Sequence, residues 1–230
     1  MTKPVDIHAL EKSIGIEFRK SELLQQALVH RSAVRESQAY GNNERLEFLG
    51  DAVLELATTE FLFRFSQKSE GELTNWRSAL VQGDHLAEVA RELEIGKYLC
   101  MSRGEEASDG RAKNSTLANA LEAIIGAVYL DKGYDVAKRF CEDFILRDLQ
   151  KLIAQGKHRD EKSLFQERAQ EKSGITPHYE VVEESGPDHD KNFKCAVFVG
   201  PEKIAEGDGN SKQRAEQAAA KAALEVKGWK

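Results

Sequence analysis

Three carboxylates stand at helical spacing within the run 43–54, which is otherwise largely apolar. Glu44, Glu47 and Asp51 follow one another at i, i+3 and i+7, so a helix places them on one face, with apolar residues on a neighbouring face. Like charges this close repel and cost a helix roughly a few tenths of a kcal/mol. The face therefore suggests a divalent-cation site. A solvated acidic stripe on an amphipathic helix is the alternative, and from spacing alone it is the more common case.

The elements that must position these carboxylates are helices. Segment 68–74 is predicted to be a loop in which Thr74 caps the following helix, and residues 102–114 are predicted to form an exposed connection. Apolar periodicity predicts helices over residues 5–14, 21–30, 44–65, 74–93, 115–131 and 134–154.

The periodicity changes after the short polar segment 155–160, which we interpret as a linker. Residues beyond it follow the order α-β-β-β-α in about 70 positions, enough for a small domain. We therefore predict one domain over residues 1–154 and a second over residues 161–230. Within the second domain, helices are predicted at 163–172 and 211–226, strands around 179–181, at 193–199 and at 203–206, and a turn at 185–190.

Composition limits the class of protein. Hydrophobic residues make up 40% of the 230 positions and charged residues 31%, as in a soluble globular protein with a core. The three cysteines are widely spaced and form neither a disulfide framework nor a zinc motif, so we expect buried thiols in a reducing cytoplasm. No secretory signal or membrane span is expected. The net charge of −6 argues weakly against a nucleic-acid partner, but such binding depends on local patches.

The run 43–54 resembles the signature motif of the ribonuclease III family, and the tail resembles a double-stranded-RNA-binding domain at 179–189 and 207–212. The resemblance covers essentially the whole chain, in the domain order of the short bacterial enzymes. It implies an all-α endonuclease domain followed by a small α+β (α-β-β-β-α) double-stranded-RNA-binding domain. Further segments that agree with the family are 27–32, 70–73 and 117–126.

The resemblance implies an endoribonuclease that hydrolyses double-stranded RNA by divalent-metal catalysis, leaving 5′-phosphate and 3′-hydroxyl ends. Carboxylate-held Mg²⁺, for which Mn²⁺ should substitute, would activate water and stabilise the developing charge. A homodimer is implied, as are roles in processing ribosomal, messenger and transfer RNA. One alternative is a metal hydrolase for another phosphoester, although the tail argues against it.

The resemblance also assigns site residues. Asn119 departs from the family, which usually has an aspartate there, so that position would bring an oxygen ligand without charge. The alternative is a catalytically impaired double-stranded-RNA-binding regulator, but the other acidic positions are present. By resemblance, the metal ligands are Glu47, Asp51, Asn119 and Glu122, and the catalytic residues are Asp51, Glu122, Glu44 and Glu70.

Two other groups of residues are interpreted more plainly. Glu70 resembles an ordinary loop carboxylate when the family is set aside. His30 and Ser32 are expected to be structural, with His30 satisfied by a core hydrogen bond rather than used in catalysis.

The RNA contacts of the tail are implied by the same resemblance, and readout of A-form shape needs little sequence preference. Residues 160–230 hold 11 basic and 14 acidic side chains, a net charge of −3, so we expect modest affinity and a shallow salt dependence. The alternative is a domain used for protein contacts. The RNA-binding residues implied are Gln166, Glu167, Pro187, His189, Lys212 and Gln213.

Overall fold

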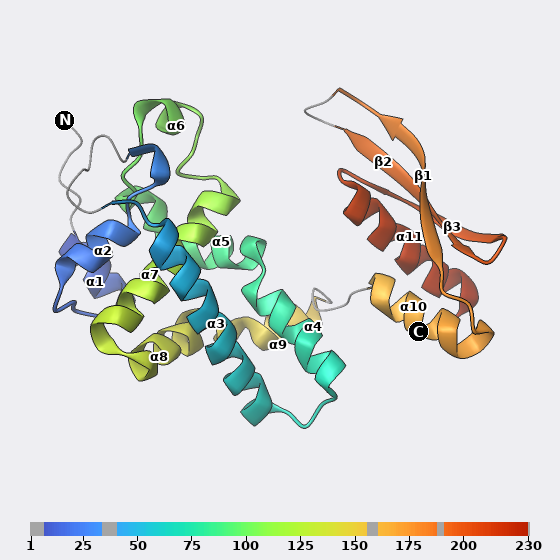
Figure 1. Ribbon diagram of the computed structural model, residues 1–230, viewed down its shortest axis with the longest axis horizontal. Helices are drawn as coiled ribbons and strands as arrows, with labels where there is room; N and C mark the ends of the chain where they lie inside the picture. Colours follow the sequence, from blue (N-terminus) through green and yellow to red (C-terminus); the bar gives the residue numbers. More distant parts are fainter. Residues whose placement is uncertain (1–6, 34–40, 156–160, 188–190, 230) are drawn as a thin grey trace. The chain divides into compact units, whose positions relative to one another are not determined.

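The computed structural model describes residues 7–33, 41–155, 161–187 and 191–229 (Figure 1). The chain forms two compact units, residues 1–158 and residues 159–230. The first unit is built from helices, with one isolated β-bridge between Val29 and Cys100 among its described residues. In chain order its elements are α1 (Ile7–Ile14), α2 (Ser21–Ala27), η1 (Arg31–Ala33), α3 (Glu44–Phe65), α4 (Glu70–Val81), α5 (Gly83–Glu92), η2 (Ile95–Tyr98), α6 (Arg103–Ala107), α7 (Asn114–Lys132), α8 (Tyr134–Phe144), η3 (Leu146–Asp148) and α9 (Leu149–Ala154).

Helices α3 and α7 lie side by side in the centre of this unit (Figure 1). Their backbones approach each other at two glycines. A Cβ on Gly50 would lie 1.7 Å from the backbone oxygen of Glu122, and one on Gly126 would lie 2.2 Å from that of Leu46. Only glycine fits either position, so the crossing point of the two helices is set by the sequence. Apolar residues of both helices belong to one buried core.

Helix α4 corrects the prediction for segment 68–74, which is not all loop. Ser69 is the N-cap: its hydroxyl accepts from the backbone N–H of Glu72 at 3.4 Å, and the Glu72 carboxylate accepts from the backbone N–H of Ser69 at 3.3 Å. This reciprocal capping box starts the helix four residues before the predicted start. Glu70 therefore lies in the first turn of α4, and Thr74 lies inside the helix rather than at its cap.

The helices predicted over 74–93 and 134–154 are each interrupted, so the prediction of continuity was wrong. Gln82 has an extended backbone, with φ −62° and ψ 135°, and it separates α4 from α5. The 3₁₀ turn η3 separates α8 from α9. Breaks this short leave the apolar pattern nearly in phase, which explains why periodicity missed them. The predicted connection 102–114 contains the short helix α6.

The second unit carries an antiparallel sheet with strand order β1-β2-β3 and two helices on one of its faces (Figure 1). Its core contains Phe165, Val197 and Leu224, and Trp229 stacks on Phe165 with ring centroids 5.5 Å apart. The fold class predicted from the sequence is confirmed. The elements are α10 (Glu161–Ser173), β1 (His178–Ser185), β2 (Asn192–Val199), β3 (Glu202–Gly209) and α11 (Lys212–Lys227).

Two further observations concern the chain as a whole. Cys100, Cys141 and Cys195 form no disulfide bond with one another; Cys141 and Cys195 are buried as expected, whereas Cys100 is half-buried. None of the helices in the described ranges combines the length and the apolar character that crossing a bilayer requires.

Candidate active site

The predicted carboxylates come together where α3 crosses α7. Glu47 and Asp51 lie on α3, and Glu122 lies on α7 beside the close approach at Gly50. Asp51 is exposed, whereas Glu47 and Glu122 are half-buried. The backbone contact between the helices therefore fixes the mutual position of acidic residues that are about 70 positions apart in the sequence.

The electrostatics of this cluster are those of crowded negative charge. Burial, reinforced by the charges of Asp51 and Glu47, raises the pKa of Glu122 to about 7. Burial likewise raises the pKa of Glu47, with Glu44 and Asp51 adding to the effect. A group that would neutralise these carboxylates is therefore favoured at the crossing point.

Asn119 lies one turn before Glu122 on α7, and its side chain lowers the pKa of the Glu47 carboxyl as a hydrogen-bond donor would. Since a carboxylate only accepts, the amide nitrogen of Asn119 is the donor. The side-chain oxygen of Asn119 is therefore the atom left for another partner.

Next to the cluster is a pocket of about 380 Å³. Glu44 lines it and accepts a hydrogen bond from Asn42 Nδ2 at 2.7 Å. Asp51 and Glu122 are not part of the lining, so Glu47 and Asn119 connect the pocket with the rest of the cluster. The lining residues are His30, Arg31, Asn43, Glu44, Glu47, Glu105, Lys113, Ser115, Thr116 and Asn119.

Glu70 is not brought to this cluster within one chain. It begins α4, just beyond the end of α3 at Phe65. From Asp51 to that end, α3 extends about 20 Å at 1.5 Å per residue. The Glu70 side chain is exposed.

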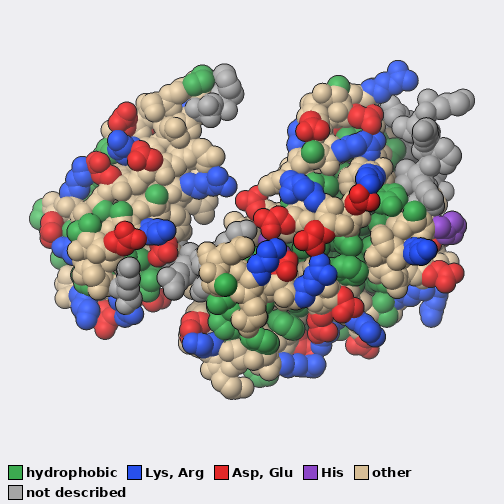
Figure 2. Space-filling view, turned by 180° about the vertical axis from the view of Figure 1, so that it is seen from behind, with side chains coloured by type: hydrophobic (Ala, Val, Ile, Leu, Met, Phe, Trp, Pro, Cys, Tyr) green, Lys and Arg blue, Asp and Glu red, His purple; other side chains and the backbone are tan. Residues whose placement is uncertain are grey.

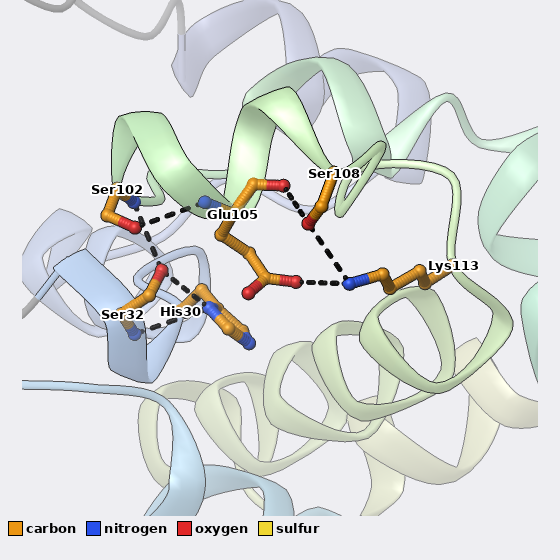
Figure 3. Close-up of polar contacts among 6 residues, drawn as sticks. All are labelled: His30, Ser32, Ser102, Glu105, Ser108 and Lys113. Atoms are coloured by element: carbon orange, nitrogen blue, oxygen red, sulfur yellow. Dashed lines mark hydrogen bonds and ion pairs between the residues drawn. The ribbon is translucent and has the colours of Figure 1, made fainter.

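The pocket contains residues that the sequence did not mark as functional. His30 and Ser32 were expected to be structural, yet His30 lines the pocket and bonds Ser32, with His30 Nδ1 2.8 Å from Ser32 Oγ (Figure 3). Burial lowers the pKa of His30. Lys113 donates to Glu105 Oε1 at 2.7 Å. The backbone N–H of Ser102 donates to Ser32 Oγ at 3.0 Å, a contact between segments 70 residues apart that no local spacing reveals.

The arrangement fits a hard divalent cation. Within the described ranges, no three carboxylate, imidazole or thiol groups converge into a ready cage for an ion. Cations that keep several of their waters need only one or two direct carboxylates. Glu47, Asp51 and Glu122 offer such carboxylates, and their crowding, with Glu47 and Glu122 half-buried, means that a cation would relieve their repulsion.

The tail presents a second site. Gln166 and Glu167 are exposed on α10 and, with Ser163, Gln170 and Thr176, line a shallow pocket of about 450 Å³. The predicted minor-groove residues of this helix therefore lie at one surface.

The remaining predicted tail residues that the structure describes lie near the other end of the sheet, where β1 and β3 end. Pro187 is exposed after β1, and His189 lies outside the described residues. Lys212 and Gln213 are exposed in the first turn of α11, which Ser211 caps by accepting from a backbone N–H at 3.2 Å. Lys212 Nζ lies 3.2 Å from a carboxylate oxygen of Glu184. Acidic and basic side chains alternate over the visible face of each unit, without a broad basic patch (Figure 2).

Comparison with known proteins agrees with both units. Residues 20–149 match the family described as Ribonuclease-III-like, and residues 161–227 match the double-stranded RNA binding motif. The chain is 44% identical over 217 residues to Ribonuclease 3 of Borreliella afzelii, covering 94% of this chain and 89% of that protein. It is 42% identical over 224 residues to Ribonuclease 3 of Dehalococcoides mccartyi, covering 96% and 94%.

A solved structure resembles the first unit. It is the nuclease domain of ribonuclease III from Campylobacter jejuni, described for flexibility in a region involved in dimer formation. Its sequence is 43% identical, its TM-score is 0.58, and the match covers 62% of this chain and 97% of that one.

The helical unit, its carboxylates and the α-β-β-β-α tail define a nuclease directed at double-stranded RNA. The chain belongs to the ribonuclease III family. The family, the endoribonuclease activity and the double-stranded-RNA-binding domain predicted from the sequence are confirmed, and the family implies dependence on a divalent metal.

Proposed function

We propose that this endoribonuclease cuts double-stranded RNA at the α3–α7 crossing, leaving 5′-phosphate and 3′-hydroxyl ends. The observation that carries the proposal is the position of Glu122 near the charges of Asp51 and Glu47. Burial raises the pKa of Glu122, and these two charges raise it further. The tail supports the choice of substrate, because its residues 161–227 match a double-stranded RNA binding motif.

Glu47, Asp51 and Glu122 would hold Mg²⁺, with Mn²⁺ as a substitute, since hard cations prefer carboxylate oxygens. When bound, the metal supplies an activated water and charge stabilisation for phosphodiester hydrolysis. The chain's own contribution is to orient the carboxylates. Asn119 would orient Glu47 through its amide nitrogen and would add an uncharged oxygen at the site.

Glu44 would act from the pocket rather than as a direct ligand. Its side chain lines the pocket, where Asn42 fixes one carboxylate oxygen and Arg31 Nη1 lies 4.0 Å from the other. A carboxylate in that position orients water or an outer metal water.

We infer that the active form is a homodimer. Along α3, Phe48, Leu56 and Phe63 are 80%, 56% and 74% exposed and share one face of the helix. Large apolar side chains exposed in such a row are typical of an interface. A face that repeats on every copy of the chain suits a symmetric dimer, which gives two cutting sites for the two strands of a duplex.

The dimer also gives Glu70 a route to the reaction. Within one chain Glu70 lies beyond the far end of α3, so any catalytic contribution would reach the carboxylates of a second copy. Mixed dimers of Glu70→Gln and Glu122→Gln chains test this. If each site combines Glu122 of one chain with Glu70 of the other, both substitutions fall in one site and the second site stays intact. If both residues act within their own chain, neither site is intact.

The tail would bind the duplex by recognising the A-form shape of the RNA. Gln166 and Glu167 line one exposed hollow, and the N-terminus of α11 with Lys212 and Gln213 offers backbone N–H groups and a cation to phosphates. Pro187 and His189 would enter a neighbouring minor groove. We place the protein in the cytoplasm, supported by three cysteines that form no disulfide bond with one another and by precursors of ribosomal and other RNA as substrates.

Incubation of the purified chain with a long RNA duplex tests the proposal. Cleavage is expected with Mg²⁺ or Mn²⁺ and not with a chelator, and the products should carry 5′-phosphates. Binding without cleavage under every metal condition would instead support the RNA-binding regulator.

Asn119→Asp is the sharper variant in this assay. A lower Mg²⁺ requirement is expected, because the variant restores a charge beside Glu47. An unchanged requirement would show that Asn119 is peripheral to the metal.

A further inference from the structure

His30 ends a hydrogen-bond chain that starts beside α6 (Figure 3). The backbone N–H of Ser102 donates to Ser32 Oγ at 3.0 Å. Because Oγ accepts this bond, its own proton is free to be donated to His30 Nδ1, 2.8 Å away. The backbone N–H of Ser32 also donates to Nδ1, at 3.3 Å.

This chain decides which ring nitrogen carries the proton. The backbone N–H of Ser32 can only donate, so its contact with Nδ1 assigns Nδ1 as the acceptor; the Ser32 hydroxyl can donate to the same atom, and neither the Nδ1–H tautomer nor the doubly protonated ring fits both contacts. The proton of the neutral ring is therefore on Nε2. A protonated nitrogen has no free lone pair, so His30 in this arrangement is a hydrogen-bond donor and not a metal ligand.

The Nε2 atom faces the pocket. In Figure 3 the ring nitrogen remote from Ser32 points toward the open space beside the Glu105 carboxylate. His30 lines the same pocket as Glu44 and Glu47. Among the residues that the structure describes, Nε2 makes no hydrogen bond, so the donor is available to a bound molecule.

The segment around α6 also holds a cation at this side of the pocket. Lys113 Nζ lies 2.7 Å from Glu105 Oε1 and 3.3 Å from Ser108 Oγ (Figure 3). Arg31, also in the lining, is exposed. Beside the carboxylates Glu44 and Glu47, the pocket thus has a second side where the neutral His30 donor lies with Arg31 and with the Lys113–Glu105 ion pair.

We propose that His30 is a substrate-positioning residue whose Nε2–H donates to a phosphate oxygen of the RNA strand held against the carboxylates. Phosphate is the anionic acceptor of RNA, and carboxylates alone would repel it, so the neighbouring cations Arg31 and Lys113 favour it over a base. The inference rests on the proposed function, because it presumes that RNA occupies this pocket.

The tautomer is tested first, without substrate. ¹⁵N NMR of the histidine rings in the full-length chain distinguishes the Nε2–H from the Nδ1–H form. We expect the Nε2–H form for His30, and a mixture of both forms in Ser32→Ala, which removes the hydroxyl donor. An Nδ1–H or doubly protonated His30 in the wild-type chain would overturn the proposal.

Two variants then test the donor. The amide nitrogen of His30→Gln falls near the place of Nε2, whereas that of His30→Asn falls near Nδ1. In single-turnover cleavage of an RNA duplex with Mg²⁺, we expect His30→Asn to be about 10- to 100-fold slower, the worth of a hydrogen bond to a charged group, and His30→Gln to recover most of the rate. Melting temperature and duplex affinity should change little in both.

The remaining outcomes separate the two proposals. If the wild-type chain cleaves and His30→Asn is equally fast, or if both variants are equally slow, His30 has only a packing role and this inference fails alone. If the wild-type chain does not cleave, the proposed function fails. The NMR test remains separate from cleavage, because an Nδ1–H or doubly protonated His30 would by itself refute the donor role of Nε2–H.

Discussion

The two units of this chain treat their charges in opposite ways. In the nuclease unit, Glu122 is half-buried near Asp51 and Glu47, and its pKa rises to about 7 because burial and like charges disfavour ionisation. In the tail, exposed cations are matched with acids, as in the pair of Lys212 and Glu184. The helix crossing of the nuclease unit keeps like charges together at a cost in stability, whereas the tail, like the rest of the nuclease surface, pairs its charges locally.

The difference follows from what each unit has to bind. A crowded set of carboxylates gains when a small, highly charged cation enters, so its instability is turned into metal affinity. A duplex is long and regular, and a surface that fits its A-form shape needs few unpaired cations. Substitutions that remove or release a charge should therefore act in opposite directions in the two units.

The largest effect is expected from Glu122→Gln, which removes one of the crowded charges. Cleavage should fall on the order of 10³-fold, because several kcal/mol of charge stabilisation are lost with the metal. Rates are measured on an RNA duplex at saturating Mg²⁺. Glu142→Gln, on the exposed face of α8, is the control and should cleave normally. Normal cleavage by Glu122→Gln would remove the crossing from the active site.

Gly50→Ala tests whether the crowding is enforced by the backbone. The new methyl group would meet the backbone oxygen of Glu122, so the helices must separate. We expect a loss of about 3 kcal/mol of unfolding free energy or more, measured by urea denaturation. Gly71→Ala is the control: nothing lies within 4 Å of its added Cβ, and it should gain up to about 1 kcal/mol from helix propensity. Equal midpoints for the two variants would contradict the close approach.

The pH dependence of the metal-free protein should reveal the same crowding. Folding raises the pKa of Glu122 from 4.5 to about 7, so between these values the folded state holds a proton that the unfolded chain has released. The contribution of Glu122 to the free energy of unfolding therefore falls as pH rises through this window and stays low above it. Thermal melting in a chelator should show this decline, and Glu122→Gln should reduce it. An identical decline in the variant would assign it to other groups.

The smallest effect is expected in the tail, from Glu184→Gln. Releasing Lys212 from its partner should strengthen duplex binding about two- to fivefold at low salt and steepen the log–log salt slope by up to about 0.9, one phosphate contact. Glu202→Gln, which frees Lys227 at the opposite end of α11, is the matched control. Equal effects of both variants would indicate general attraction rather than a contact by Lys212.

Much of this arrangement could be predicted from the sequence where the signal is local. Helix α3 has its predicted ends at Glu44 and Phe65, because the carboxylates and the apolar face share one long period. The link from Asp51 to Glu122 came from family resemblance, since no spacing rule joins residues on different helices. The start of α4 was misplaced because Thr74 was preferred over the Ser69–Glu72 capping box as the signal.

What the sequence did not reveal depends on contacts across the fold. From the sequence, His30 was interpreted as structural. Its hydrogen-bond partner Ser32 is itself bonded by Ser102, which lies 70 residues further along the chain and is not evident from local spacing. Its tautomer, and therefore its chemistry, follows from a backbone N–H whose position no pattern of side chains encodes. Glu70 was expected beside the other acids, but the length of α3 keeps it away within one chain.

The glycine contact between α3 and α7 has a consequence for how this enzyme can diverge. Main-chain atoms set the spacing of the two helices. Side chains that project from the crossing can therefore be substituted without moving the helix backbones. An amide at position 119 in place of a carboxylate alters the charge of the site without relocating its neighbours. Metal preference can thus drift or be engineered one residue at a time, whereas replacing Gly50 would force the helix backbones themselves apart.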